Sequence, residues 1–336
     1  MYSVALEQTI LPLSMVTPSL LLLWYFHSRD AYPEPASVIW KTFALGVLTV
    51  IPVLAFALPL GSYAEGLSSP YLAGLYDAFV LAAFPEEAAK LAVVYWYARR
   101  HSEFDEPMDG LVYGVAASLG FATLENILYV ADGGLAVALM RALTSIPGHA
   151  TFGAIMGYFV GQAHFEPGRA RRFLVLALAL PVLLHGVYDA PLMIAQRAGS
   201  ADGQLVGFLL MLVPAALIVS IFTALRMSKT LRAEQLAQGP APQVGSMPMP
   251  MPSPMPAQSR GLGLFLVILG GLVATAASLL LMMVLLVLLS GAAAQDEKGP
   301  AVVAFFSLIG GLMLIAGILV FRAGTRRANG SASRSS

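Results

Sequence analysis

Long apolar runs alternate with short polar connections along most of the chain, and each run is long enough to cross a bilayer. A membrane-spanning helix needs about 20 mostly apolar residues. The pattern therefore predicts an all-α, polytopic transmembrane helix bundle of about nine spans, at about 9–26, 38–60, 74–98, 108–130, 134–163, 173–195, 204–226, 262–290 and 301–322. The fifth span is long and could be tilted or broken at Pro147-Gly148, because proline removes a helical hydrogen bond.

One segment between the spans differs from the other connections. Residues 237–260 are rich in Pro, Met and Ser, which is typical of a linker rather than of a packed core. This predicts a seven-span core and a two-span hairpin. The expected divisions are a membrane-embedded core at 1–230, a Met/Pro-rich cytoplasmic linker at 231–260, a C-terminal transmembrane hairpin at 261–322 and a cytoplasmic tail at 323–336. The interiors of the hairpin spans hold no ionisable residue. We therefore expect the hairpin to serve in helix packing or membrane anchoring, and we expect any chemistry to lie in the first seven spans.

Composition agrees with a membrane protein. Hydrophobic residues make up 58% of the chain and charged residues only 11%, whereas soluble domains carry about a quarter charged residues. The net charge is zero, which gives no reason to expect nucleic acid as a partner, and the lack of cysteine excludes disulfides and thiolate chemistry.

The first 26 residues contain no Lys or Arg. They therefore lack the basic start of a signal peptide, and we expect a first span that is retained.

The Lys and Arg residues predict the orientation. Of the nineteen in the chain, fifteen fall on one side of the predicted spans and two on the other, while Lys90 and Arg141 lie within spans. The positive-inside rule places the N-terminus outside and the C-terminus in the cytoplasm.

A charge at the centre of a span costs about 2.5–3.5 kcal/mol on insertion scales, so such residues normally face a bundle interior or a water-filled cavity. The third span contains Glu86, Glu87 and Lys90, at helical spacings that place the lysine near both acids. Pro85 suggests that the helix bends or restarts there, with the glutamates near a new N-terminus that would favour their charge. Two adjacent carboxylates suit general acid–base work. A Glu–Lys pair that only joins two spans is the structural alternative.

Three further spans carry ionisable residues. Glu125 and Asn126 lie in the fourth span, where the acid could simply reach water from the outer end. The fifth span carries His149, an outer Arg141 that is an anchor or counter-ion, and a stripe of glycines that favours close helix packing: Gly153, Gly157 and Gly161. In the sixth span His185 and Asp189 are four residues apart and share a face, as in a structural hydrogen bond or a site in which the acid orients the imidazole.

Depth favours one shared site over several unrelated pairs. Counted from the predicted cytoplasmic ends, Glu86, Glu125, His149, His185 and Asp189 lie 12 to 17 residues inside their spans. At about 1.5 Å per residue this is roughly 18–25 Å from the inner boundary. Unrelated structural pairs have no reason to share a depth, and oxygen and nitrogen donors without thiols make a plausible set for Zn²⁺.

These motifs resemble the PrsW family of intramembrane proteases, related to the CAAX prenyl proteases and Abi proteins. The family pattern is EExxK, FxxxE, a histidine on the next helix and HxxxD. The chain shows Glu86-Glu87-x-x-Lys90, Phe121-x-x-x-Glu125, His149 and His185-x-x-x-Asp189, in order and on consecutive spans. The loop at 32–35, Tyr-Pro-Glu-Pro, is similar to an early family segment, and the resemblance covers roughly residues 10–225.

The resemblance implies cleavage of a membrane-anchored protein substrate, such as an anti-sigma factor, in the plasma membrane of a prokaryote. It implies that Glu86 or Glu87 activates water and that Asp189 orients His185. Glu125, His149 and His185 would hold a metal, Zn²⁺, or stabilise the oxyanion in a metal-free glutamic mechanism. Two other functions remain open on the sequence: an ion-coupled transporter, which also places acids and histidines in a membrane cavity, and a noncatalytic membrane scaffold or binding protein.

Overall fold

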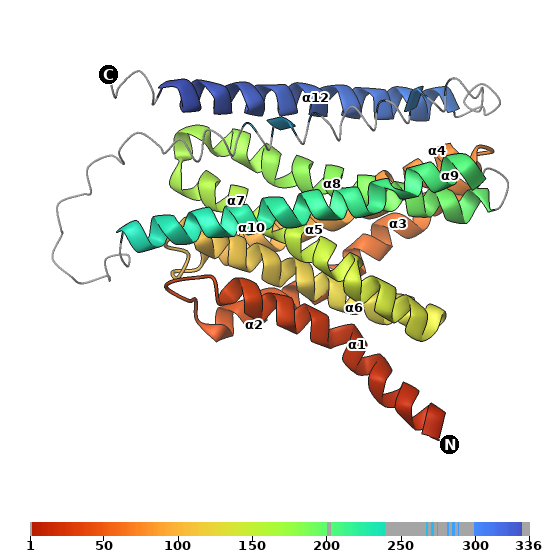
Figure 1. Ribbon diagram of the computed structural model, residues 1–336, viewed down its shortest axis with the longest axis horizontal. Coiled ribbons are helices and arrows are strands. Elements are labelled where there is room, and N and C mark those ends of the chain that lie inside the picture. The colour runs from red at the N-terminus through yellow and green to blue at the C-terminus, as the bar shows by residue number, and fades with distance from the viewer. Residues whose placement is uncertain are drawn as a thin grey trace. The chain divides into compact units, whose positions relative to one another are not determined.

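A computed structural model of the chain describes residues 2–199, 203–238 and 299–330, with single positions at 267, 270, 271, 274, 281, 284, 285 and 288. All regular secondary structure in these described residues is helical (Figure 1). The all-α prediction is confirmed. Four helical stretches there are long and apolar enough to cross a membrane: Ala36–Glu65, Pro107–Ala131, Pro167–Ala198 and Leu205–Ala237. The count of nine spans remains a prediction.

The chain forms two compact units. One comprises Met1–Gly66 with Ala73–Pro240, and the other comprises Leu67–Leu72 with Ala241–Ser336. All of the predicted site residues belong to the first unit. The division at Pro240 falls inside the predicted linker, whose first eight residues continue a helix to Gln238; its remaining residues, 239–260, lie outside the described residues.

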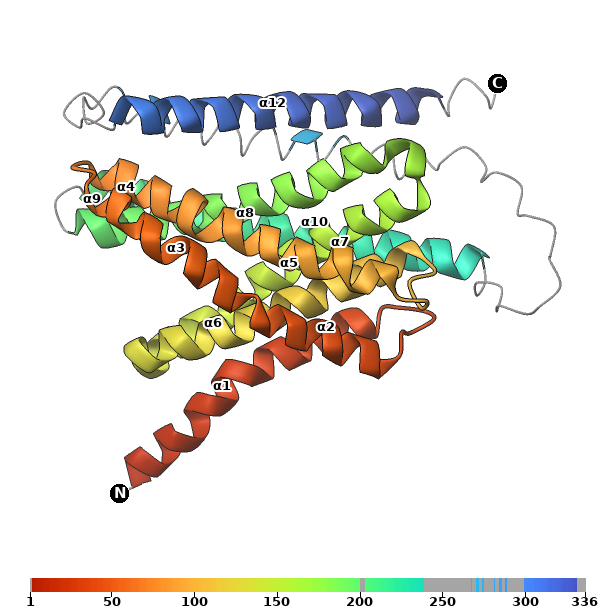
Figure 2. The ribbon, with the colours of Figure 1, turned by 180° about the vertical axis from the view of Figure 1, so that it is seen from behind.

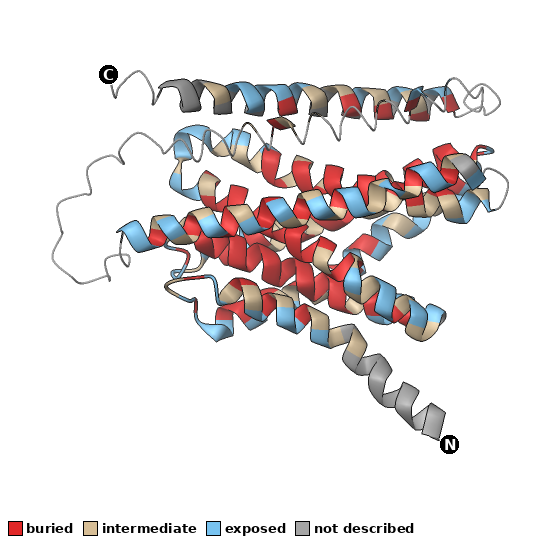
Figure 3. Cartoon of the chain, in the orientation of Figure 1, coloured by how far each residue is buried: buried red, intermediate tan, exposed pale blue. Residues whose placement is uncertain are grey.

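Two helices form the buried centre of the first unit. They are α6 (Pro107–Leu143) and α7 (Ser145–Phe165), and nearly all of α7 is buried (Figure 3). The glycine stripe explains how close they lie: a methyl group at Gly157 would collide with the carbonyl oxygen of Gly110, and one at Gly161 would meet that of Pro107. The predicted packing role of the stripe is confirmed.

Other helices surround this centre. α1 (Tyr2–His27) and α2 (Ala36–Leu48) contact α6, while α8 (Ala170–Ala198) and α10 (Leu212–Gln238) contact α7 and each other (Figure 2). α3 (Val50–Glu65), α4 (Pro70–Tyr76), α5 (Phe84–Trp96) and α9 (Gly203–Leu210) complete the described α-helices of this part of the chain. Many large apolar side chains of these outer helices are exposed, among them Leu58, Met211 and Ile218. In water such a surface would be unfavourable, so it marks the face that meets lipid.

Several predicted spans are divided in the structure. The second is two helices, α2 and α3, which meet at Thr49. α6 joins two helical segments at Gly134, whose φ of 66° favours glycine. Arg141 after this point pairs with Glu125 before it, so the chain turns back here, next to the predicted connection at 131–133. The fifth predicted span, expected to be tilted or broken at Pro147-Gly148, is broken slightly earlier, at Thr144 between the ends of α6 and α7. Pro147 sits in the first turn of α7, where its missing N–H costs no hydrogen bond.

The second unit is described mainly by α12 (Gly299–Gly330), which extends beyond both ends of the predicted ninth span at 301–322. Gly270 lies so close to α12 that a methyl group there would collide with the backbone of Phe321. Most of the predicted eighth span, 262–290, lies outside the described residues.

Candidate active site

Glu86 and Glu87 lie in the first turn of α5 (Phe84–Trp96), directly after a π-helical segment, η1 (Asp77–Ala83). The predicted restart at Pro85 is therefore a change of helix type. The Phe84 N–H donates to the Phe79 carbonyl, so helical hydrogen bonding continues across the junction. The glutamates stand in the first turn of α5, as predicted, and an effect of this helix start on their charge remains a prediction. Single π-helical turns are frequent at functional sites.

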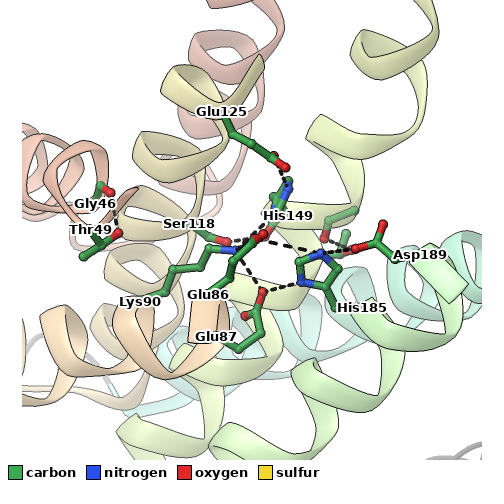
Figure 4. Close-up of polar contacts among 12 residues, drawn as sticks. Gly46, Thr49, Glu86, Glu87, Lys90, Ser118, Glu125, His149, His185 and Asp189 are labelled. Atoms are coloured by element: carbon green, nitrogen blue, oxygen red, sulfur yellow. Dashed lines mark hydrogen bonds and ion pairs between the residues drawn. The ribbon is translucent and has the colours of Figure 1, made fainter. Parts of the chain in front are cut away.

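Lys90 is the residue on which the site converges (Figure 4). Its Nζ lies 3.1 Å from Glu86 Oε2, 2.9 Å from Glu87 Oε1 and 3.0 Å from His149 Nδ1. An ammonium has three N–H donors, so these contacts use all of them. Nζ also lies 4.1 Å from the centre of the Phe121 ring, a cation–π contact. The predicted Glu–Lys contacts are confirmed, and the lysine additionally joins α5 to α7.

His149 extends the network to a second acid. Because Lys90 donates to Nδ1, the ring proton is assigned to Nε2, which donates to Glu125 Oε2 at 2.9 Å. Glu125 also pairs with Arg141 at 2.7 Å, and Arg141 Nε donates to Asn126 Oδ1. Arg141 is thus a counter-ion, one of its two predicted roles, and Glu125 does not rely on water alone.

His185 lies between two carboxylates. Its Nδ1 is 2.9 Å from Glu87 Oε1 and its Nε2 is 3.0 Å from Asp189 Oδ2, which confirms the predicted contact along α8. An imidazolium would donate to both acids, since each ring nitrogen then carries a proton. Nε2 also lies 3.9 Å from Glu86 Oε2. Glu87 therefore links Lys90 to His185 through one oxygen.

Aromatic rings close the site. The His149 and His185 rings are 5.1 Å apart and nearly perpendicular, and the Phe152 ring stacks on His185 at 5.3 Å. Gly186 has no room for a side chain because the Phe79 ring of η1 lies against it. The polar groups at the centre are buried, with Lys90 and Glu87 fully enclosed.

We use the name Lys90 network for the connected set of Glu86, Glu87, Lys90, Glu125, Arg141, His149, His185 and Asp189. It contains all six residues predicted as catalytic, drawn from α5, α6, α7 and α8. Whether each acts in catalysis remains a prediction. Sequence reasoning missed the bridging position of Lys90 and the stacking of Phe152. The bridging position of Lys90 had a signal in the sequence, because a lysine at membrane depth needs a partner for each of its three N–H donors. The stacking of Phe152 had no such signal.

The donor set suits a metal in type and spacing. Glu86, Glu87, His149 and His185 each offer a ligand atom, and these atoms lie within 4.8 Å of one another. Oxygen and nitrogen donors of this kind hold Zn²⁺ in proteins. Glu87 Oε2 is also buried without a hydrogen-bond partner, as a ligand atom would be. However, the Lys90 ammonium contacts three of these four side chains, so an ion held by them would compete with it. Of the three predicted ligands, His149 and His185 belong to this group, whereas Glu125 contacts His149 through the other ring nitrogen.

The fold and the site define a helical membrane protein with a buried acid–histidine centre of the kind that activates water. Residues 34–220, which contain the whole Lys90 network, match the PrsW family of intramembrane metalloproteases. The chain belongs to this family, as its motifs suggested. It is a membrane-embedded bacterial protease that acts on membrane-embedded substrates.

Three relatives illustrate the similarity, and each carries the name Protease PrsW. The protein of Geobacillus kaustophilus (strain HTA426) is 44% identical over 185 residues, which are 55% of this chain and 80% of the relative. That of Bacillus subtilis (strain 168) is 40% identical over 176 residues, 52% and 78% of the two chains. That of Clostridioides difficile (strain 630) is 35% identical over 191 residues, 54% and 79%. No solved structure matches the chain.

Proposed function

We propose that this chain is an intramembrane endopeptidase that cleaves a membrane-anchored protein at the Lys90 network, with Glu86 as the group that activates water. The observation that carries the proposal is the meeting of Glu86 Oε2 and His185 Nε2, 3.9 Å apart, inside a buried bundle. A single water molecule at that position would contact a base and a proton donor at once.

The two glutamates differ in their surroundings, and the difference supports Glu86. One oxygen of Glu87 accepts from both Lys90 and His185, and its side chain is fully buried. Glu86 contacts Lys90 alone within hydrogen-bond distance and keeps a small exposed fraction, 7% of its side chain. Glu87 is therefore suited to hold His185 in place, and Glu86 to meet a water molecule.

The proposed reaction balances as a peptide hydrolysis. Glu86 takes a proton from water as the water oxygen bonds to the scissile carbonyl carbon. The His185 Nε2–H leaves Asp189 Oδ2 and donates to the carbonyl oxygen as that oxygen becomes negative. Glu87, on Nδ1, and the nearby Asp189 carboxylate stabilise the charged ring. The C–N bond then breaks while the protonated Glu86 gives its proton to the leaving amine, which regenerates the carboxylate.

The family is named for a metal, and the donor set fits one. Glu86, Glu87, His149 and His185 would hold the ion, which we propose to be Zn²⁺. A bound Zn²⁺ lowers the pKa of its water and polarises a carbonyl. Lys90 would then have to turn away from three of those residues. In the alternative, metal-free arrangement the Lys90 ammonium keeps its contacts with Glu86, Glu87 and His149 and supplies the positive charge of the site.

The substrate class rests on the family resemblance. We propose a single-span regulatory protein of the anti-sigma-factor type, cut in regulated intramembrane proteolysis, with the N-terminus of the enzyme outside and its C-terminus in the cytoplasm. The fifteen-to-two distribution of Lys and Arg supports this orientation.

The test uses the full-length protein reconstituted in vesicles with a single-span substrate. Glu86→Gln, Glu87→Gln and His185→Ala should each slow cleavage by about 10²-fold or more, because each removes a proton-transfer group or its positioning partner. Glu65→Gln, the same change on an exposed acid at the end of α3, should cleave normally. Thermal unfolding and elution volume check that the variants are folded. Cleavage at the wild-type rate by all three site variants would end the proposal.

A further inference from the structure

A second polar cluster lies outside the Lys90 network, where the loop after α1, the loop before α6 and the end of α10 meet. Its five carboxylates, here called the carboxylate junction, are Asp30, Glu34, Asp105, Glu106 and Asp109. In Figure 1 these loops and the C-terminal end of α10 gather at the same end of the bundle. Two overlapping groups of three ligand atoms lie within 4.8 Å of one another: Asp30, Glu106 and Asp109, and Glu34, Asp105 and Asp109.

Hydrogen bonds hold Asp30 and Asp109 in place through one carboxylate oxygen of each, and the other oxygen of each has no hydrogen-bond partner. Asp30 Oδ1 accepts from the Tyr32 N–H and from Gln235 Nε2, at 2.9 and 2.7 Å. Asp109 Oδ2 accepts from the backbone N–H groups of Asp105 and Glu106 at 2.8 and 2.7 Å. The second oxygens, Asp30 Oδ2 and Asp109 Oδ1, are buried without a hydrogen-bond partner in side chains whose residues are 4% and 0% exposed. A buried unpaired carboxylate oxygen is costly.

The junction also lacks a positive partner. Among the described residues, no Lys, Arg or His forms an ion pair with any of its five acids. The nearby Arg232 donates instead to the backbone carbonyls of Ser28 and Arg29. Burial and mutual repulsion raise the pKa of Glu34 and Glu106 to about 7 and that of Asp109 to about 10, as expected for acids that are crowded together without a positive partner.

We propose that the carboxylate junction binds a hard divalent cation of the Ca²⁺ or Mg²⁺ type, held by Asp30, Glu106 and Asp109. Both acids that carry an unpartnered oxygen, Asp30 and Asp109, belong to this group of three. Its donors are all oxygen, which such cations prefer, whereas the Lys90 network also offers imidazole nitrogen. Ca²⁺–oxygen distances of about 2.3–2.6 Å allow two ligands of one ion to lie up to about 5 Å apart. The three ligand atoms here lie within 4.8 Å of one another, so they are close enough to share an ion.

The acids of the junction range from enclosed to exposed. Asp30 and Asp109 are enclosed, while Glu106 is partly exposed and Asp105 is exposed at the surface. A bound cation would join the loop after α1 to the first turn of α6. Gln235, which donates to Asp30 and Glu106, adds the end of α10. The site would therefore stabilise the ends of three helices without touching the reacting groups.

The test measures thermal unfolding of the detergent-solubilised full-length protein at pH 8, after EDTA treatment, with CaCl₂ or MgCl₂ added. NaCl at equal ionic strength controls for screening. One of the divalent salts should raise Tm saturably, by about 5 °C at a hundredfold excess over Kd. Asp30→Asn should lose the shift while remaining folded, because its Oδ1 still accepts from Tyr32 and Gln235. Glu103→Gln, an exposed acid in the same loop as Asp105, should keep it.

Two further measurements make the result decisive. His149→Ala removes a donor of the Lys90 network and should keep the shift, which separates the two sites. Equilibrium dialysis followed by elemental analysis should find one cation per chain that Asp30→Asn lacks. The proposal is overturned if neither divalent salt exceeds the NaCl control, or if Asp30→Asn shifts as much as wild type. The first result would mean that protons alone neutralise the junction, and the second that the cation binds elsewhere.

Discussion

At the scale of single residues, the Lys90 network is built from contacts within single helices and contacts between helices. Residues three or four apart share a face, so Lys90 with its two glutamates and His185 with Asp189 were foreseeable. The contacts between helices, Lys90 to His149 and His185 to Glu87, were not. They depend on how each helix is rotated about its axis, which neither hydropathy nor a shared depth specifies.

Lys90→Met tests whether lysine and metal compete. If the ammonium occupies space among the ligands, the variant should retain more zinc than wild type at pH 7.5, because a neutral side chain no longer opposes the ion. Zinc per chain, measured by elemental analysis after dialysis against a zinc buffer, is the readout. Lys90→Arg keeps the charge and should resemble wild type. Equal zinc in Lys90→Met and wild type would contradict the competition.

Asp189→Asn tests a positioning role. The amide can still contact His185 but no longer balances a charged ring, so kcat should fall about 10- to 100-fold while KM changes little. Cleavage kinetics with the single-span substrate supply both constants. A rise in KM at constant kcat would instead assign Asp189 to substrate binding.

At the scale of elements, the apolar pattern located the helices but not their interruptions. The breaks at Thr49 and Thr144 and the π-helical segment at Asp77–Ala83 all lie within apolar sequence, where hydropathy carries no signal. The interruption of α6 at Gly134 has a local cause, because glycine readily adopts a positive φ. The glycine stripe of α7 was informative, since regular spacing of small residues predicts close contact on one face.

Gly157→Ala tests that contact. The added methyl would strike the Gly110 carbonyl of α6, so the helices must separate, at a cost of about 1–3 kcal/mol. Gly168→Ala is the matched control, because nothing lies within 4 Å of the corresponding position. Thermal unfolding should show a lower Tm for Gly157→Ala alone. Equal values for the two variants would mean that the backbones are not held this closely.

At the scale of the whole molecule, the site and the family match both lie within the first unit. The match ends at residue 220, and the first unit ends at Pro240. A chain stopped after residue 240 should therefore cleave the substrate at a rate comparable to that of the full chain in vesicles. The same truncation carrying Glu86→Gln gives the background. A folded but inactive truncation would show that the C-terminal region takes part in catalysis or substrate capture.

Stability should depend on pH in the absence of divalent cations. The pKa of Glu34 and Glu106 is raised to about 7 by burial, with Asp30 and Asp105 adding to the rise in both. Between pH 4.5 and 7 the folded protein therefore binds more protons than the unfolded chain at these groups. Their contribution to the free energy of unfolding thus decreases as pH rises through this range. In EDTA, Tm should be lower at pH 8 than at pH 5.5, and Glu34→Gln should reduce the difference. A Tm that does not change between pH 5.5 and pH 8 would contradict the raised pKa of Glu34 and Glu106.

The ion pairs of Lys90 also bear on how the chain enters the membrane during synthesis. Both glutamates and the lysine belong to α5, at spacings of three and four residues, so they can pair before α7 and α8 exist. A helix that neutralises most of its own charge pays a smaller penalty for leaving the translocation channel than three separate charges would. This segment can therefore enter the lipid before the later helices are made. Its two glutamates and one lysine leave one negative charge, which His185 can pair with once α8 has been inserted. A mutation of Lys90 would accordingly harm biogenesis before it harmed turnover, and its first sign would be less protein in the membrane.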